Sequence, residues 1–314
     1  MGRGSGFGKV ILFNEHFVVY GIPGIVSAID SIVYAEARKT REGIIIKDER
    51  KGEKGYTEKK KIQQRDSIDR MLKAMGFSLE KSSLEIFLGG NLPSFSGIGA
   101  SAASSVAIAR AIAEEFKLDL SDKKINDIAY EAEKAYAGTP SGIDNTAATY
   151  GGLIWFKRAL CGIPNTIEKL SIKKPIEIVI GNTGIVADTK AMVTGVAARK
   201  KKNPEKYDQL FKQAEELAFT ARKALEDFDL RKVGKLMNEN HLQLQEIEVS
   251  CEELNYLVNL AQEKGAFGAK LTGGGGGGCM AALTPGRTLQ EKVATTIENE
   301  GFKVLKTKIG IRKI

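Results

Sequence analysis

Residues 93–105 read PSFSGIGASAASS, and the fold prediction depends first on this stretch. Gly97 and Gly99 stand directly before a run of small residues, which we expect to form a helix ending near Phe116. The N–H groups and the dipole at a helix start attract phosphate, and glycine lets the backbone approach a ligand closely. An ordinary helix packed through its alanines would have the same composition. The stretch by itself therefore leaves phosphate binding and simple packing open.

Six consecutive glycines, Gly273–Gly278, are the second unusual feature. Ordering such a run costs conformational entropy, so it is a candidate anion-binding nest or a lid over a nucleotide. The apolar segment Cys279–Leu283 follows directly and is expected to be a strand, which disfavours a flexible linker. The alternative is a turn required for tight packing.

Two carboxylates lie on either side of a turn at residues 138–142. Glu133 is in a predicted helix before this turn, and Asp144 follows it. Together they could bind Mg²⁺ and supply a general base. Taken singly, Asp144 is more often a turn or capping residue, Glu133 a solvated one, and His16 a structural histidine. The sequence pattern alone leaves these alternatives open.

Two familiar nucleotide-binding patterns are not met. Gly8-Lys9 is followed by Val10 instead of Ser or Thr, and Arg3 stands where a Walker A loop has its first glycine. The pattern GxGxxG occurs only inside the polyglycine run, without a preceding strand and a following helix. A P-loop NTPase and a Rossmann dehydrogenase are therefore both disfavoured.

Composition and charge indicate the broad class. A chain of 314 residues exceeds what one core usually spans, which predicts two lobes. Its 42% apolar and 27% charged residues are typical of a folded soluble protein, and no apolar stretch approaches the length of a membrane span. Three cysteines without CxxC spacing disfavour a zinc site. The basic residues behind the net charge of +8 are scattered, so we interpret them mainly as solvated faces and only secondarily as a means of drawing in anionic ligands, and we expect no nucleic acid as partner. Without a membrane-span or signal-peptide pattern, we expect no membrane and a cytoplasmic location.

Strands and helices alternate irregularly, which predicts an α+β fold. Lys173-Lys174-Pro175 precedes a predicted strand, so we expect domains at 1–174 and 175–314. The highly charged residues 39–64 predict a hairpin or an exposed excursion. Residues 186–263 are expected to be helical, with breaks at Pro204 and at Asn238–Asn240.

Three segments in order resemble the three motifs of the GHMP kinases: Gly8–His16, Pro93–Ala102 and Lys270–Cys279. The resemblance implies a two-lobed fold, with an N-terminal mixed α/β nucleotide-binding lobe and a C-terminal ferredoxin-like α+β lobe. It also implies ATP as co-substrate, Mg²⁺ as cofactor and a homodimer. Within the family, residues 9–21, 138–146 and 269–273 resemble the eukaryotic-like branch that phosphorylates the C5 hydroxyl of mevalonate.

The resemblance also implies roles for single residues. Asp144 corresponds to the catalytic base, and Lys9 to the cation that steadies it. Ser101 and Glu133 correspond to the Mg²⁺ ligands. The residues implied to line the mevalonate pocket are His16, Glu15 and Thr189. Those implied to bind the nucleotide are Ser94, Ser96, Gly97, Ile98, Gly99, Ala100, Ser101, Ala102, Ser104, Gly273, Gly274, Gly275 and Gly276.

Four positions depart from the family pattern: Asn14 and Phe7 replace a usual Gly and Pro, Ala100 a common Ser, and Gly274 a usual Ala. Asn tolerates left-handed backbone angles, so Asn14 is expected to be harmless, whereas Gly274 is expected to loosen its loop. Two other functions stay open. One is a sister kinase acting on another hydroxyl, the 3-hydroxyl of mevalonate or a sugar hydroxyl. The other is a non-catalytic nucleotide-binding relative.

Overall fold

The computed structural model describes residues 1–311 except 42, 51–55, 78–82, 94, 162–163 and 187. The chain forms two compact units whose segments alternate in the sequence. Unit 1 comprises Met1–Lys9, Asp30–Phe95 and Gly99–Gly151; unit 2 comprises Val10–Ile29, Ser96–Ile98 and Gly152–Ile314. These units do not follow a single cut in the chain. The expected boundary between 1–174 and 175–314 stays a prediction.

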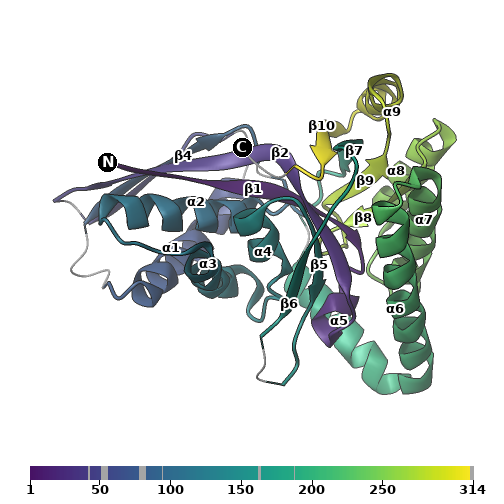
Figure 1. The fold of residues 1–314 in the computed structure, drawn as a ribbon, viewed down its shortest axis with the longest axis horizontal. Coiled ribbons are helices and arrows are strands. Elements are labelled where there is room, and N and C mark those ends of the chain that lie inside the picture. The colour runs from purple at the N-terminus through teal and green to yellow at the C-terminus, as the bar shows by residue number, and fades with distance from the viewer. Residues whose placement is uncertain are drawn as a thin grey trace. The chain divides into compact units, whose positions relative to one another are not determined.

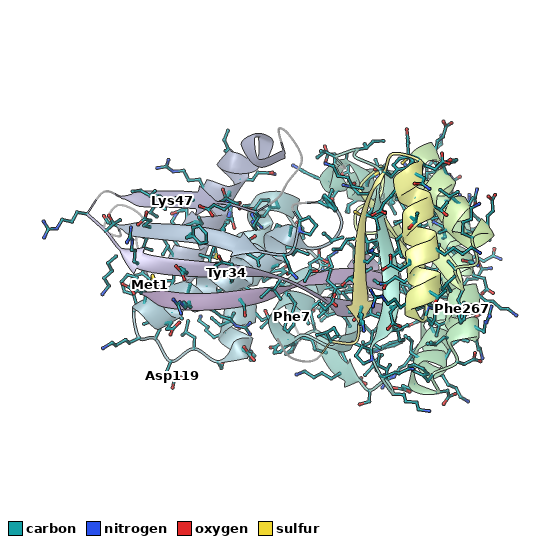
Figure 2. All side chains as sticks on the ribbon, turned by 90° about the horizontal axis from the view of Figure 1, so that it is seen from above. Met1, Phe7, Tyr34, Lys47, Asp119 and Phe267 are labelled. Atoms are coloured by element: carbon teal, nitrogen blue, oxygen red, sulfur yellow. The ribbon has the colours of Figure 1, made fainter. Side chains whose placement is uncertain are left out.

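In unit 1, helices cover one face of a sheet (Figure 1). Strand β3 (Ile44–Asp48) runs parallel to β4 (Leu84–Gly90), which pairs antiparallel with the second part of β2 (Gly24–Lys39). Figure 2 looks onto this sheet, with Lys47 of β3 and Tyr34 of β2 labelled. The helices, which contact one another, are α1 (Tyr56–Ala74), α2 (Ala100–Glu115), α3 (Asp122–Ala137) and α4 (Ile143–Tyr150).

The first strand, β1 (Gly2–Phe13), is close to helix α2 because alternate residues at its start are glycines. A Cβ atom on Gly2, Gly4 or Gly6 would lie only 2.2–2.3 Å from the carbonyl oxygens of Ala111, Ala107 and Ala103 respectively. The strand repeat of two residues thus matches the four-residue spacing along one face of the helix. The small residues expected in α2 therefore serve close packing, and the predicted helix is confirmed.

The prediction of a hairpin at 39–64 is wrong for the residues that the structure describes there. Strand β3 pairs with β4, in parallel, and helix α1 lies between the two in the sequence. Parallel neighbours require a crossover connection, which a tight hairpin turn cannot supply. The charged segment is therefore the beginning of a βαβ unit. Residues 42 and 51–55 lie outside the described part of the chain.

Unit 2 combines an antiparallel sheet with a group of helices (Figure 1). Its strands are ordered β10-β7-β9-β8, and the first part of β2 pairs with β5 and, through Ile29, with β10. A core of buried apolar side chains from these strands and helices includes Phe17, Tyr207 and Leu271. The strands are β5 (Leu153–Lys157), β6 (Thr166–Leu170), β7 (Ile176–Asn182), β8 (Gly268–Thr272), β9 (Cys279–Leu283) and β10 (Lys303–Ile309). The helices are η1 (Phe17–Tyr20), α5 (Thr189–Lys202), α6 (Pro204–Glu226), α7 (Leu230–Glu246), α8 (Glu252–Glu263) and α9 (Arg287–Asn299).

Both units contain strands and helices, so the α+β class is confirmed. The expected helix break at Pro204 is confirmed, since α6 begins there. The break at Asn238–Asn240 is wrong, because these residues lie inside α7. Their side chains make tertiary hydrogen bonds: Asn238 Oδ1 accepts from the Ala269 N–H at 2.9 Å, and such contacts override weak helix propensity. The chain leaves the helical conformation instead at Phe228 and Glu248, whose φ angles are 60° and 58°.

None of the helices in the described ranges combines the length and the apolar character that a membrane crossing requires.

Candidate active site

A lysine and an aspartate far apart in the sequence meet in unit 1. Lys9 Nζ lies 3.0 Å from Asp144 Oδ1, and the Lys9 side chain is 1% exposed while that of Asp144 is 36% exposed. Asp144 stands in the first turn of α4, which begins after Gly142 with a φ of 91°. The aspartate is thus open to a ligand and is held by a buried cation, as the sequence resemblance implies for a base and its partner.

The start of α2 lies beside the same lysine. Gly99 caps the helix with a φ of 74°, and a Cβ atom there would lie 2.5 Å from Lys9 Cγ. Any other residue would therefore be strained and would press on the Lys9 side chain. In the first turn, Ser104 Oγ donates to the Ala100 carbonyl at 2.6 Å and is within 2.6 Å of the Arg50 guanidinium. The close approach at Gly99 thus places Lys9 at the helix start, and the contacts of Ser104 hold the first turn to Arg50.

A buried carboxylate completes this group. Ser101 Oγ donates to Glu133 Oε2 at 3.2 Å, and Glu133 Oε1 accepts no hydrogen bond from any described residue. Burial, followed by the charge of Asp144, raises the pKa of Glu133 to about 8. The hydroxyl of Ser101, the charge of Lys9 and the hydroxyl of Ser105 act in the opposite direction. A carboxylate so poorly compensated is one that a bound cation would stabilise.

The donor set of Glu133 and Ser101 fits Mg²⁺. The described part of the chain holds no cluster of three His, Cys, Asp or Glu residues that could bind a metal by themselves. Mg²⁺ commonly takes only one or two protein carboxylates and completes its octahedron with water and substrate phosphates. A single buried carboxylate with an adjacent hydroxyl is consistent with that habit.

In unit 2, the glycine loop packs against Ser96–Ile98 through its backbone. A Cβ on Gly273 would lie 2.6 Å from Gly97 Cα, and a Cβ on Gly97 would lie 2.7 Å from the Thr272 carbonyl oxygen. Five of the six loop glycines, all except Gly274, have positive φ angles. The glycines at these positions are therefore required for tight backbone packing, which is the alternative that the sequence left open beside a role in ligand binding. Nucleotide contact by this loop stays a prediction, and Ser94 lies outside the described residues.

Gly274 makes room for a neighbour instead of loosening the loop. A Cβ at this position would lie 2.3 Å from Thr189 Oγ1, so the threonine side chain fills the space that an alanine methyl would need. The carbonyl of Gly274 is 2.9 Å from His16 Nε2. His16 and Thr189, which the sequence assigns to one pocket, thus both contact Gly274.

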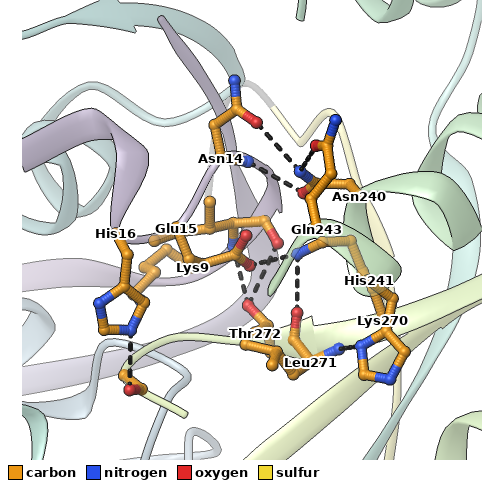
Figure 3. A network of polar contacts seen from close by, with 12 residues as sticks. Lys9, Asn14, Glu15, His16, Asn240, His241, Gln243, Lys270, Leu271 and Thr272 are labelled. Carbon is orange, nitrogen blue, oxygen red and sulfur yellow. Dashed lines mark hydrogen bonds and ion pairs between the residues drawn. The ribbon is translucent and has the colours of Figure 1, made fainter. Parts of the chain in front are cut away.

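Sequence reasoning missed the partner of Glu15. The Glu15 carboxylate forms an ion pair with Lys270 Nζ, and the two side chains are 1% and 0% exposed (Figure 3). Lys270 Nζ also donates to the Leu271 carbonyl at 2.7 Å. A lysine inside an otherwise apolar strand was the signal available in the sequence. The role of Glu15 in substrate binding stays a prediction.

His241 follows Asn238-Glu239-Asn240, a polar segment that predicts a helix surface or an interface. The residue is instead buried, at 4% exposed. Its Nδ1 accepts from the Leu271 N–H at 3.4 Å, and its Nε2 lies 3.2 Å from Asn255 Oδ1. His241 is therefore part of the packing between α7 and β8.

Because His16 and His241 are buried, we expect unit 2 to lose stability in acid. Burial lowers the pKa of His16 and of His241 from 6.5 to about 4, and the Lys270 charge contributes to both shifts. Between these pH values the unfolded chain binds more protons than the folded one. The free energy of unfolding should therefore fall as the pH drops from 6.5 towards 4, by up to about 1.4 kcal/mol per pH unit for each histidine.

Urea unfolding between pH 4 and pH 7 measures this effect. Glu133 acts in the opposite sense, because its raised pKa makes the folded state bind the extra proton, so the comparison must be with a variant. The variant His241→Gln keeps a hydrogen-bonding side chain and should show a shallower fall in stability across the window. The same slope in both proteins would contradict the prediction.

Comparison with known proteins agrees with this geometry. The model of the GHMP kinases N terminal domain matches residues 64–152, and that of the GHMP kinases C terminal domain matches residues 221–303. The mevalonate kinase of Pyrococcus horikoshii is 34% identical over 96% of this chain and 93% of its own.

Two solved structures are similar over nearly the whole chain. The L. major mevalonate kinase, crystallised with R-mevalonate, has 35% identity and a TM-score of 0.92, covering 100% of this chain and 97% of its own. The Methanococcus jannaschii mevalonate kinase has 25% identity and a TM-score of 0.78, covering 98% of each chain. With two domain models, a near full-length relative and the expected two-lobed α+β fold, the chain belongs to the GHMP kinase family and is a small-molecule kinase that uses ATP as co-substrate.

Proposed function

We propose that this protein transfers the γ-phosphate of ATP to the C5 hydroxyl of mevalonate, giving 5-phosphomevalonate and ADP. The observation that carries the proposal is the Lys9–Asp144 pair, 3.0 Å apart, next to the start of α2. Phosphoryl transfer needs positioned groups and neutralised charge more than covalent chemistry. The similarity to mevalonate kinases supports the choice of substrate.

In this proposal Asp144 accepts the proton of the attacking hydroxyl. Its partly exposed side chain is accessible to an alcohol, and the buried Lys9 ammonium holds the carboxylate in place. The same ammonium lies at the positive end of the α2 dipole, where negative charge on a transferring phosphoryl group would be stabilised. The N–H groups of residues 99–102, with Ser104 behind them, are assigned to the phosphates of the nucleotide.

Glu133 and Ser101 would hold Mg²⁺. When bound, the ion would supply positive charge that neutralises the phosphate groups of the nucleotide. Without it, the buried Glu133 carboxyl has a raised pKa and tends to keep a proton. The Ser101 hydroxyl already orients one of its oxygens. We assign substrate binding to His16, Thr189 and Glu15. Further contacts with the nucleotide are assigned to Gly273–Gly276. A homodimer and a cytoplasmic location stay predictions.

Product identification tests the proposal. Purified protein with Mg-ATP and mevalonate should form ADP and one new phosphomonoester, whose phosphorus NMR coupling to methylene protons identifies the C5 position. Phosphate on the tertiary C3 oxygen would show no such coupling and would indicate a sister kinase. A panel of sugars scored by ADP release covers the other alternative. ATP binding in calorimetry without any product would instead indicate a non-catalytic relative.

A further inference from the structure

The turn between β1 and η1 holds an unusual backbone. Asn14 and His16, neither of them glycine, have φ angles of 70° and 62°. Left-handed conformations of this kind persist only where the surroundings hold them, and they are frequent at functional sites. The turn also carries Glu15, so it presents two of the three residues assigned to the substrate. The contacts that hold this turn therefore bear on the reaction.

Asn14 is bonded through every polar group it has. Its backbone N–H donates to Asn240 Oδ1 at 3.1 Å, and Asn240 Nδ2 donates back to Asn14 Oδ1 at 3.0 Å (Figure 3). Its side-chain amide donates to the carbonyls of Pro23 and Ala214 at 2.7 and 2.8 Å. Asn14 and Asn240 are both 0% exposed. The reciprocal pair therefore ties the turn to α7 and, through Ala214, to α6.

Glycine would satisfy the left-handed φ angle at position 14 as well as asparagine does. What asparagine adds is the set of side-chain bonds to Asn240, Pro23 and Ala214. All of these partners belong to the protein, so the added bonds fix the turn and leave no group of Asn14 for a ligand. Two residues later, His16 Nε2 meets the Gly274 carbonyl at 2.9 Å. A shift of the turn would change that contact.

We propose that Asn14 and Asn240 act as a positioning pair, which holds His16 against the glycine loop in the orientation that the alcohol substrate requires. The inference rests on the proposed function, which it deepens by naming residues that control the substrate site without touching the substrate. Asn14 and Asn240 each donate one hydrogen bond to the other. Replacing either residue therefore removes bonds that hold the turn against α7.

Steady-state kinetics of Asn14→Gly, Asn240→Ala and the double variant test the pair. Glycine adopts the φ angle of position 14 without strain, so Asn14→Gly removes the side-chain bonds that hold the turn without adding a steric conflict. We expect kcat/KM for mevalonate to fall by about tenfold or more, because small displacements of positioning groups are costly, while KM for ATP stays unchanged. The double variant should be no worse than the poorer single variant. Asn14→Asp keeps the acceptor for Asn240 but turns a buried carboxylate oxygen towards the Pro23 and Ala214 carbonyls, so it should be no better than Asn14→Gly.

The matched control is Gln290→Ala. Gln290 is buried in unit 2 and donates from Nε2 to the carbonyls of Ile178 and Thr307 at 2.8 and 2.9 Å, so its loss also removes two buried bonds. This variant should lose stability and keep kcat/KM. Equal losses of kcat/KM in Gln290→Ala and Asn14→Gly, or additive losses in the double variant, would overturn the inference.

A second readout does not depend on turnover. The chain has only two histidines, so the imidazole nitrogen NMR signals can be assigned with His241→Gln. Asn14→Gly should shift the signals of His16, and Gln290→Ala should leave them in place. An unchanged His16 signal in Asn14→Gly would refute the positioning pair. If the unmodified protein forms no phosphomevalonate, the proposed function fails, and the NMR result still decides whether the pair positions His16.

Discussion

Replacing Asp144 by asparagine is expected to lower the turnover number by about 10²–10⁴-fold, the usual contribution of a positioned general base. The variant keeps the size of the side chain and its position in the first turn of α4, but it cannot accept the proton of the attacking alcohol. Lys9, 3.0 Å away and buried, loses its anionic partner as well, so the charge balance at the helix start is disturbed. Binding of ATP should persist, because the nucleotide is assigned to the start of α2. Steady-state assays of ADP release and calorimetry with ATP measure the two quantities.

A matched control is Asp127→Asn. Asp127 lies on α3, is 54% exposed and pairs only with the exposed Lys123 among the contacts resolved for it, so its loss should not alter turnover. Turnover of Asp144→Asn within tenfold of the unmodified protein would remove Asp144 from the role of base. It would then leave Asp144 as an anchor for Lys9.

The second large effect concerns stability. The variant Lys270→Met removes the cation that is paired with the buried Glu15 carboxylate, and breaking one side of a buried ion pair typically costs about 3–5 kcal/mol. The free energy of unfolding, measured with urea, should fall by that order. The double variant Lys270→Met with Glu15→Gln removes both charges and should recover a large part of the loss.

An exposed ion pair in the same unit provides the contrast. Lys306 and Glu291 lie 2.8 Å apart, and each is more than 40% exposed, so Lys306→Met should change the urea midpoint little. If Lys270→Met were as mild as Lys306→Met, the buried pair would not contribute as argued. The same conclusion would follow if the double variant were as unstable as the single one.

The sequence could predict the meeting of Lys9 with Asp144 because both residues sit inside segments that resemble the family. The pairing of Ser101 with Glu133 followed from the same resemblance, although Glu133 lies outside these segments. The helix after Gly99 followed from glycine and small-residue chemistry. In these cases the position of a residue followed from its neighbours in the sequence or from the arrangement that the family shares. Such reasoning was sufficient for Lys9, Ser101, Glu133 and Asp144 in unit 1.

The partners of Asn14 and Glu15 could not be found in the same way. They are Asn240 and Lys270, and single residues more than 200 positions apart leave no mark of their pairing in one sequence. The asparagines of α7 even pointed in the wrong direction, towards a helix break, because propensity ignores the tertiary bonds that hold Asn238 and Asn240. The reason for a glycine at position 274 was missed in a similar way. The space beside it is filled by Thr189, a residue distant in the sequence.

The alternating glycines of β1 affect where the Lys9 ammonium lies relative to helix α2. Each even-numbered glycine from 2 to 6 touches the backbone of α2, and Lys9 comes three residues later on the same strand. A methyl group at any of these positions would lift the strand away from the helix and carry the ammonium with it. The glycines at positions 2, 4 and 6 therefore help to set the distance between Lys9 and Gly99. Residues 2–6 should be kept when the protein is expressed, because their removal would expose the alanine side of α2 to solvent.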